Sequence, residues 1–424
     1  MKIQKAAEKA QTDVKLFCDQ HAQQFKTLCE AANIDYDRFI RTTDADHKAA
    51  VAHFWSELSH KGYIYEAEHT GWYSVSDETF YPEAQVQRVL DPSSGITKMV
   101  SIETGKEVER TSEVNYHFRL SKFQGKLLDY YRANGAAIVP PERRNFIVKE
   151  IESGLKDLSI SRPSSRLTWG IPVPGDDSQT IYVWLDALIN YITMAGYPFK
   201  DNTNTGSLWP PNCQVIGKDI IRFHTIYWPA FLMALNLPIP ERFLTHAHWT
   251  MNSEKMSKSS GNGVNPFFAI DRYGVDTIRF YMVHEGGILN DSDYENSHIA
   301  RTYNTILRNQ YGNLLQRVFK STKISPRQAI HWVSQVDPED EIRRYLEKPG
   351  EPEDSEVRAP LEDTRKQYQR LQRLAHRVKK NMEIPNPHRA VGAISHIIRQ
   401  VCRVDGPVPV QELTFHSANE FLDQ

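Results

Sequence analysis

Two lysines lie three residues apart in the segment Lys-Met-Ser-Lys-Ser at 255–259, and glycines follow at 261 and 263. Ammonium groups on a glycine-flanked loop can close over a polyphosphate and neutralise the charge that develops on a departing pyrophosphate. Lys255 and Lys258 therefore indicate adenylyl transfer as a candidate reaction. The alternative is a solvated polar loop without a chemical role.

A second candidate, Gly217-Lys218-Asp219, stands between an apolar run typical of a strand and the start of a helix. A glycine lets the backbone approach a ligand closely, and the N–H groups at a helix start suit a nucleotide. Asp219 has an alternative role as the N-cap of that helix, and both roles can hold together.

Several segments resemble a known family. The segment at 255–259 is similar to the signature loop of class I aminoacyl-tRNA synthetases, and residues 115–121, 181–191 and 215–224 look like segments of the methionyl-tRNA synthetases in that class. The resemblance runs from residue 1 to about residue 320 and weakens beyond it. It implies an α/β fold: an incomplete Rossmann-like doubly wound catalytic domain with a small inserted connective module, followed by an all-α anticodon-binding domain.

By resemblance, the chain is a methionine–tRNA ligase that activates methionine with ATP and Mg2+ and transfers it to tRNA(Met) in organellar translation. A flexible, polarizable thioether is well received by aromatic and aliphatic walls. Taken singly, each aromatic residue is better explained as core packing, but their joint match favours a pocket. The residues that match the family's methionine pocket are Trp184, Tyr191, Ile220 and His224, with Ala187 and Trp228 in support.

The resemblance also assigns residues to ATP and to the tRNA. Those implied in catalysis near the phosphates are Lys255, Ser257, Lys258 and Arg162, and those implied in ATP binding are Gly217, Asp219, Met256 and Ser259. A surface ion pair is the alternative for Arg162. Asn313 and Arg317, four residues apart on one predicted helix, match the family's anticodon-reading pair. No tryptophan follows Trp332, where the family has one that stacks on the anticodon.

The inserted module at 76–115 has no cysteine pair, and the four cysteines of the chain are scattered at 18, 29, 213 and 402. This pattern is similar to the zinc-free bacterial and mitochondrial subgroup of the family. We therefore expect no metal site in the protein, no zinc and no disulfide framework.

Residues 1–8 resemble the stretch just after the family's Gly-Thr-Asp-Glu-His-Gly segment. On this interpretation the first strand and the His-Ile-Gly-His-type signature are missing. Such a chain should activate methionine poorly, because losing one transition-state donor alone costs on the order of 100-fold in rate. An incomplete gene model or an alternative isoform would explain the same observation.

Two rival functions follow. A non-catalytic relic that binds tRNA or protein is favoured by the missing segment. A class I ligase for leucine, isoleucine, valine or cysteine would need a large editing insertion or a cysteine–zinc site, and the sequence shows neither.

Apolar periodicity predicts the elements that position these residues. Steps of three and four predict a helix from Ile3 to Leu28 and another over 46–60, capped near Thr43 or Asp44 and ended at Gly62. The helix over 362–382 is strongly basic, either as a solvated face or as an RNA contact. Strands are predicted at 63–68, 71–75, 181–184, 214–216 and 243–245, the last three in a parallel sheet, and further helices at 121–133, 142–153, 295–319 and 388–401.

These elements predict a catalytic domain at 1–75 and 116–250, interrupted by the connective module at 76–115. A signature-loop and stem-contact region at 251–294, the anticodon-binding domain at 295–400 and a weakly structured tail at 401–424 follow.

The composition bounds the class of protein. With 424 residues, 40% of them hydrophobic and 25% charged, the chain is long enough for two or three globular domains. Its net charge of −2 means that an RNA partner must be held by local basic patches. No apolar run could span a membrane, and no targeting signal is recognised. Likeness to the mitochondrial subgroup favours the mitochondrial matrix, otherwise the cytoplasm. A monomer is expected because no dimerisation module follows the helical domain.

Overall fold

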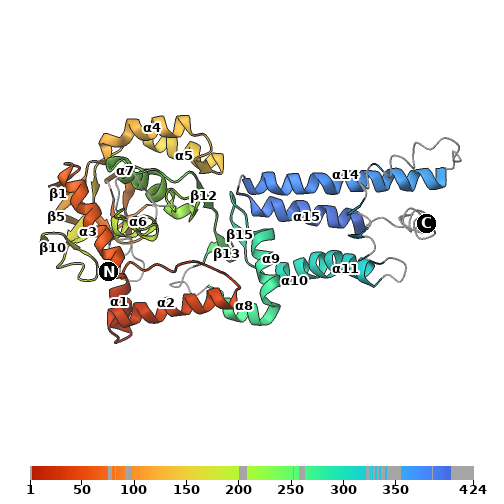
Figure 1. The fold of residues 1–424 in the computed structure, drawn as a ribbon. Coiled ribbons are helices and arrows are strands. Elements are labelled where there is room, and N and C mark those ends of the chain that lie inside the picture. Colours follow the sequence, from red (N-terminus) through yellow and green to blue (C-terminus); the bar gives the residue numbers. More distant parts are fainter. Residues whose placement is uncertain are drawn as a thin grey trace. The chain divides into compact units, whose positions relative to one another are not determined.

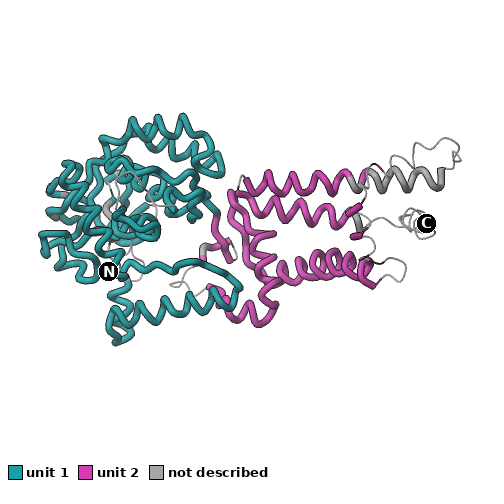
Figure 2. Tube along the Cα trace, viewed as in Figure 1, with its two compact units in different colours: residues 1–246 teal, residues 247–424 magenta. Residues whose placement is uncertain are grey.

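The chain forms two compact units, Met1–His246 and Ala247–Gln424 (Figure 2). The computed structural model describes residues 2–199, 208–320 and 355–402, with the exception of 75–78, 82, 91–94, 96, 103, 252, 257–262 and 384. It also describes some positions between 325 and 340. The unit boundary after His246 lies close to the predicted start of the signature-loop region.

The first unit begins with α1 (Lys2–Lys9) and α2 (Val14–Ala31) rather than with the single helix expected from Ile3 to Leu28. The break has a local cause: Gln11 adopts a left-handed φ of 51°, and the side chain of Asp13 accepts a hydrogen bond from the Leu16 N–H as an N-cap. The next helix, α3 (Ala45–His60), confirms the prediction, with Asp44 as its N-cap residue.

Two long antiparallel strands, β1 (Ile64–Ser74) and β5 (Glu109–Phe118), pair from Ile64 with Phe118 to Tyr73 with Glu109. The separate strands expected at 63–68 and 71–75 are therefore one strand. β2 (Thr79–Tyr81) and β7 (Leu158–Ser159) complete the sheet in the order β2-β1-β5-β7. Between β2 and β5, β3 (Val86–Leu90) and β4 (Thr97–Ser101) form a separate pair.

A parallel sheet of three strands has the order β11-β12-β6. β11 (Gln214–Gly217) and β12 (Phe243–His246) confirm two predicted strands, whereas the third strand is β6 (Ile138–Val139). The expected strand at 181–184 is wrong. β10 (Asp176–Ile181) ends there and belongs to an antiparallel sheet with β8 (Ser161–Pro163) and β9 (Pro172–Val173), and the apolar run after it is helical.

Helices surround these sheets in the first unit (Figure 1). They are α4 (Gln124–Ala133), α5 (Pro141–Glu152), α6 (Val183–Met194) and α7 (Trp228–Ala234), and α3 packs against α6. Pro141 at the first turn of α5 is typical of a helix start. The apolar core joins the helices to the strands through large buried side chains, among them Phe54, Tyr131, Trp228 and Phe231.

The second unit is mainly helical. It contains short strands β13 (Trp249–Met251), β14 (Glu254–Lys255) and β15 (Ser292–Asp293), then α8 (Pro266–Tyr273) and α9 (Val275–Glu285). The predicted helix at 295–319 is continuous: α10 (Asn296–Thr302), a π-helical stretch Tyr303–Tyr311 and α11 (Gly312–Phe319).

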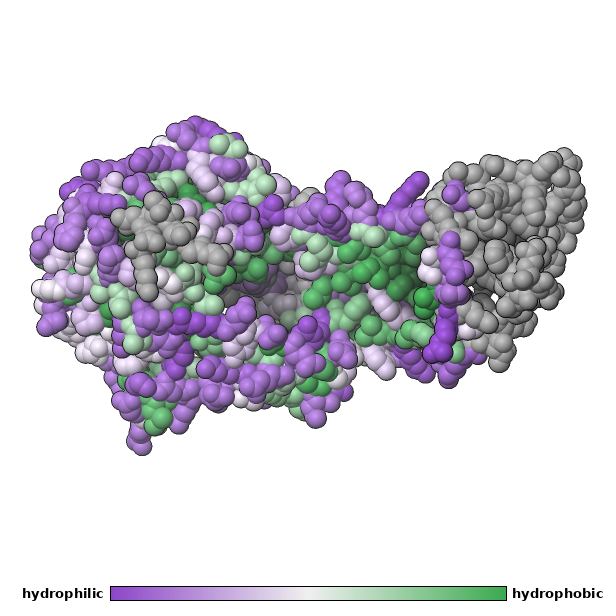
Figure 3. All heavy atoms as spheres, viewed as in Figure 1, coloured by the Kyte–Doolittle hydropathy of each residue, from purple (hydrophilic) through white to green (hydrophobic). Residues whose placement is uncertain are grey.

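The last two helices, α14 (Ser355–Glu383) and α15 (Pro387–Cys402), lie side by side (Figure 1). Hydrophobic residues gather between α15 and the 296–319 helix, whereas α14 carries hydrophilic residues along its edge (Figure 3). Ile299, Ile306 and Ile397 are among the buried side chains there. None of the described helices is both long and apolar enough to cross a membrane.

Candidate active site

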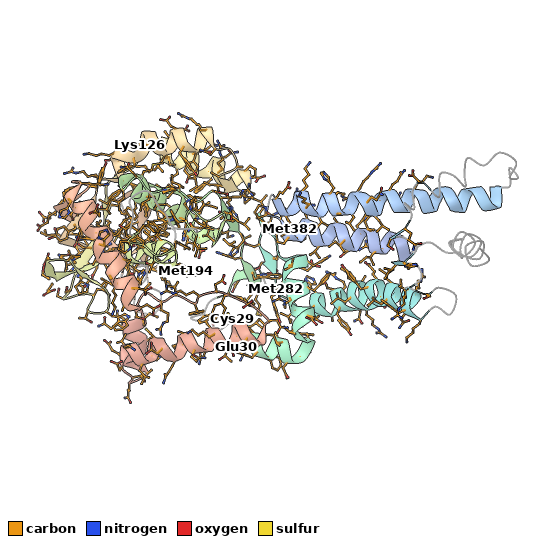
Figure 4. All side chains as sticks on the ribbon, in the orientation of Figure 1. Cys29, Glu30, Lys126, Met194, Met282 and Met382 are labelled. Carbon is orange, nitrogen blue, oxygen red and sulfur yellow. The ribbon has the colours of Figure 1, made fainter. Side chains whose placement is uncertain are left out.

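Helix α6 presents two different faces. Leu185, Leu188, Ile189 and Ile192 are buried in the core. Trp184, Ala187 and Tyr191, at steps of three and four, are only partly buried. Met194, labelled in Figure 4, is the last residue of this helix. The helical spacing therefore places three of the predicted pocket residues on one face beside the core.

The opposite wall is the segment after β11. A 3-10 turn (Lys218–Ile220) leads into a π-helical stretch (Phe223–Tyr227), and α7 follows. Ile220, His224 and Trp228 recur at steps of four along this segment, with His224 and Trp228 buried. Single π-helical turns occur often at functional sites.

Aromatic contacts join the two walls. The Trp184 ring stacks on Phe223 with centroids 3.7 Å apart and planes 8° apart, and it meets His224 edge-on at 6.3 Å. Tyr191 lies 6.3 Å from Trp228. The structure therefore brings together the predicted residues Trp184, Tyr191, Ile220, His224 and Trp228. Ala187 lies on the same face of α6 as Trp184 and Tyr191. The structure adds Phe223, which the sequence analysis did not single out.

The polar groups of this cluster satisfy each other. The Tyr191 hydroxyl lies 2.8 Å from His224 Nε2, and His224 Nδ1 lies 3.0 Å from the Ile220 carbonyl oxygen. A carbonyl can only accept, so Nδ1 carries the hydrogen and Nε2 accepts from the tyrosine. Burial lowers the pKa of His224 and raises the pKa of Tyr191 to about 12. Both groups are therefore uncharged at neutral pH, which suits an uncharged, polarizable side chain.

A buried histidine of α3 forms hydrogen bonds with α6. His47 of α3 is fully buried, with Nε2 2.7 Å from Asp186 Oδ1 and Nδ1 3.2 Å from Thr193 Oγ1, both on α6. The ring thus joins α3 to both ends of α6 and fixes the helix that carries Trp184 and Tyr191. No local sequence motif signals this contact, because Asp186 is 139 residues away.

Gly217 and Asp219 lie at the carboxyl end of β11 in the parallel sheet, the edge at which ligands bind in open α/β sheets. Gly217, not Asp219, is the N-cap residue of the 3-10 turn, and Asp219 is an exposed residue within that turn. The N-cap alternative for Asp219 is therefore wrong. Ile220 follows at once, so this nucleotide candidate adjoins the aromatic cluster.

Arg162 lies in β8 and is 6% exposed, so the alternative of a surface ion pair is wrong. Its Nη1 donates to Ser159 Oγ at 2.8 Å and to the Ser161 carbonyl oxygen at 2.7 Å. The guanidinium also lies over the ring of Tyr182, 4.6 Å from its centroid. Because Tyr182 is the N-cap residue of α6, Arg162 lies near the start of the pocket helix.

In the second unit, a short hairpin leads into the predicted signature loop. Lys255 in β14 pairs with Thr250 in β13. Asp293 of β15 accepts hydrogen bonds from the Thr250 hydroxyl and from the Ser253 N–H, and these bonds lower the pKa of Asp293. Met256 is partly buried. Ser257, Lys258 and Ser259 lie outside the described residues, as does the side chain of Lys255.

The predicted anticodon pair lies on α11. Asn313 and Arg317 are both exposed and share one face of the helix, as their spacing predicts. Trp332 and the tail from 403 onwards lie outside the described residues. In the described part of the chain there is no group of three or more histidine, cysteine, aspartate or glutamate residues that could hold a metal ion.

Comparison with known proteins decides the family. Residues 1–319 match the family model for class I tRNA synthetases (M). The chain belongs to this family. The synthetase chain is 55% identical over 331 residues to a Neurospora crassa protein named "Probable methionine--tRNA ligase, mitochondrial", covering 78% of this chain and 53% of that protein. It is 46% identical over 317 residues to the mitochondrial methionine–tRNA ligase of Homo sapiens, covering 75% and 53%.

A solved structure extends this likeness to the fold. Mycobacterium tuberculosis methionyl-tRNA synthetase bound by methionyl-adenylate is similar with a TM-score of 0.77 and 33% identity, over 98% of this chain and 77% of that one. The mixed α/β structure of this synthetase chain thus matches the methionyl-tRNA synthetase fold. The chain spans slightly more than half of the length of the curated relatives just named.

Proposed function

We propose that this synthetase chain is a methionine–tRNA ligase, which forms methionyl-adenylate from methionine and ATP and transfers the methionyl group to tRNA(Met). The observation that carries the proposal is the uncharged aromatic cluster on α6 and the 218–228 segment, in which Tyr191 bonds to His224 and Trp184 stacks on Phe223. Such a cluster offers a thioether polarizable walls and no charge. The names of the relatives support the same substrate.

In the proposed reaction, the methionine carboxylate attacks the α-phosphate of ATP in line and pyrophosphate leaves. Lys255 and Lys258, with Ser257, stabilise the charge on the leaving pyrophosphate. Arg162 adds positive charge near the phosphates. Gly217, Asp219, Met256 and Ser259 hold the nucleotide. Magnesium enters bound to the ATP phosphates, the mode that this ion prefers.

In the second step, the terminal ribose hydroxyl of the tRNA attacks the carbonyl carbon of the adenylate, and AMP leaves. Trp184, Ala187, Tyr191, Ile220, His224 and Trp228 select the methionine side chain. Asn313 and Arg317 on α11 read the anticodon. Their exposed amide and guanidinium groups can bond to unstacked base edges.

The proposal divides the chain as the sequence predicts. A Rossmann-like doubly wound catalytic domain at 1–75 and 116–250 carries the connective module at 76–115, without zinc. The signature-loop region at 251–294 and an all-α anticodon-binding domain at 295–400 follow. The protein acts as a monomer in the mitochondrial matrix, the compartment in the names of the relatives.

The test is methionine-dependent exchange between pyrophosphate and ATP, followed by charging of a tRNA(Met) transcript, both with the full chain. Replacing Trp184→Ala removes the stacked ring and should raise the KM for methionine by about tenfold or more, because burying an aromatic ring is worth about 1.5–3 kcal/mol. The KM for ATP should stay within about twofold.

Phe146→Ala is the matched control, because Phe146 is an aromatic residue of α5 that is 57% exposed. It should leave both constants unchanged. Methionine use that is equally insensitive to Trp184→Ala would contradict the pocket. Binding of tRNA without any methionine-dependent exchange would contradict the ligase function itself.

A further inference from the structure

A proline interrupts the hydrogen bonding of the helical wall in the proposed methionine pocket. Pro229 is the second residue of α7, directly after the π-helical stretch that carries Phe223 and His224. In an α-helix the carbonyl of residue 225 accepts a hydrogen bond from the N–H of residue 229, but proline has no N–H. The Thr225 carbonyl therefore lacks the donor that a regular helix would supply, although Thr225 is fully buried.

A tyrosine from another helix supplies a donor to this carbonyl. The Tyr131 hydroxyl, on α4, donates a hydrogen bond to the Thr225 carbonyl oxygen. Tyr131 is fully buried, and burial holds its pKa well above the ordinary value of 10, so the hydroxyl keeps its hydrogen. Lys126, labelled in Figure 4, lies on the same helix. The bond joins positions 94 residues apart, so no local sequence pattern signals it.

An arginine of the next helix fixes the backbone of this tyrosine. Nε and Nη2 of Arg144, on α5, both donate to the Tyr131 carbonyl oxygen, Nε at 3.1 Å. Tyr131 lies in the last turn of α4, where the carbonyls have no partner within the helix. Helices α4 and α5 lie side by side (Figure 1). The position of the Tyr131 hydroxyl is therefore set by two helices.

The backbone at Thr225 is closely tied to the side chains of the pocket. His224 Nδ1 donates to the Ile220 carbonyl oxygen at 3.0 Å, and Thr225 Oγ1 donates to the Ile221 carbonyl oxygen at 2.7 Å. His224 Nε2 lies 2.8 Å from the hydroxyl of Tyr191 on α6. A shift of the Thr225 carbonyl would therefore move the neighbouring His224 ring away from its partners.

We propose that Tyr131 is a positioning residue for methionine binding, because its hydroxyl holds the Thr225 carbonyl and thereby keeps the His224 ring at the pocket wall. The inference rests on the proposed function, which supplies methionine as the ligand. Tyr131 acts through the backbone of Thr225 and not through contact with methionine. Its effect should appear in the binding of methionine and not in the binding of ATP.

The test replaces Tyr131→Phe in the full chain, which removes one hydroxyl and keeps the ring. The Kd for methionine, measured by isothermal titration calorimetry, should rise by about three- to tenfold, the usual effect of losing one hydrogen bond. In pyrophosphate exchange the KM for methionine should rise by a similar factor, whereas kcat and the KM for ATP should stay within about twofold. A merely structural defect would reduce the fraction of active protein, and so the apparent kcat, without raising the KM.

The matched control is Tyr130→Phe, next to Tyr131 on the same helix. The Tyr130 hydroxyl also donates to a backbone carbonyl, that of Pro240, at 3.4 Å. Pro240 lies beyond the end of α7, so this variant should leave the Kd for methionine unchanged. An unchanged Kd in Tyr131→Phe, or an equal rise in both variants, would overturn the proposal.

A second variant tests whether the Thr225 carbonyl is the point of action. Pro229→Ala restores an N–H four residues after Thr225, so the Tyr131 hydroxyl should become less important. Tyr131→Phe should therefore raise the Kd for methionine less in the Pro229→Ala chain than in the unaltered chain. An equal or larger rise would overturn the role assigned to the carbonyl.

Hydrogen–deuterium exchange of the ligand-free protein separates this inference from the proposed function. Tyr131→Phe should speed deuterium uptake by the amides at 223–228, and Tyr130→Phe should not. An unaltered chain that binds no methionine would refute the ligase function and, with it, the role of Tyr131 in methionine binding. Normal binding by the unaltered chain, with neither the Kd nor the deuterium uptake changed in Tyr131→Phe, would refute the role of Tyr131 alone.

Discussion

The hydrogen bond between Tyr191 and His224 decides the charge of the candidate pocket. His224 is buried and its Nδ1–H is committed to the Ile220 carbonyl, so its Nε2 can only accept the proton of the tyrosine hydroxyl while the ring is neutral. Protonation of His224 would make Nε2 a donor, so the tyrosine hydroxyl would have to turn and accept, and a positive charge would enter the buried pocket. The pocket should therefore favour uncharged side chains and become less favourable for them in acid.

A pH dependence of stability follows. Burial lowers the pKa of His224 below its ordinary value of 6.5. Between those two values the unfolded chain binds more protons than the folded chain, so stability rises with pH. The stabilising effect is complete above about pH 6.5 and is lost as the pH falls through the lower pKa of the folded state. Thermal unfolding of the unaltered chain and of His224→Gln, measured from pH 8 to pH 5, checks this.

The His224→Gln variant should lack this component of acid destabilisation. The difference between the melting temperatures of the two proteins should therefore narrow as the pH falls. Parallel pH profiles would contradict it. His117, whose pKa burial also lowers, is present in both proteins and cancels in the comparison.

At the scale of elements, most helices could be predicted because their ends carry local signals. Asp44 before α3, Gly62 after it and Pro141 at the start of α5 fix those bounds in the sequence itself. The strand expected at 181–184 failed for a physical reason. A short apolar run fits a buried strand and a buried helix equally well, and here the chain turns helical at Val183.

Some residues of the candidate site could be predicted from the sequence, and others could not. Trp184, Tyr191 and His224 could be found from their segments and from the family likeness. Phe223 could not be found in this way. In a regular α-helix, adjacent residues such as Phe223 and His224 point in different directions, and only the structure shows the π-helical stretch and the stacking of Phe223 on the Trp184 indole. The contact of His47 with Asp186 is set by the packing of α3 on α6, which no local pattern encodes.

His47 should therefore act as a positioning residue for α6. Replacing His47→Ala leaves a cavity and removes the partner of Asp186, and we expect a loss of about 2 kcal/mol or more in the free energy of unfolding. The KM for methionine should also rise, because Trp184 and Tyr191 lie on the loosened helix. Chemical denaturation and pyrophosphate exchange measure the two effects.

The matched control is His60→Ala, an exposed histidine in the last turn of the same helix. It should change neither quantity appreciably. If His47→Ala is no more destabilising than His60→Ala, the contacts of His47 with α6 do not contribute to stability. A loss of stability with an unchanged methionine KM would limit the role of His47 to packing.

At the scale of the whole molecule, the assigned contacts fall in different units. The residues proposed for the methionine pocket lie within 1–246, and the proposed anticodon pair lies within 247–424. Hydrogen–deuterium exchange with each ligand separately should show this division. Methionine should slow exchange in 183–194 and 218–234, and tRNA should slow it in 312–319, because a bound ligand stabilises the elements that contact it.

The reverse pattern, or protection of α14 and α15 by methionine alone, would contradict the assignment of ligands to units. The unaltered chain in buffer serves as the baseline.

A stripe of five exposed cations on α14 has a consequence for encounters between copies of the protein. The stripe consists of Lys366, Arg370, Arg373, Arg377 and Lys380. Its spacing of three and four residues is that of a coiled-coil seam, in which apolar side chains draw two helices together. Here lysine and arginine occupy the seam, so two copies that approach along this face repel each other. These residues thus oppose association of two copies through this helix. Crowded copies should remain separate until high salt or a bridging nucleic acid screens the seam.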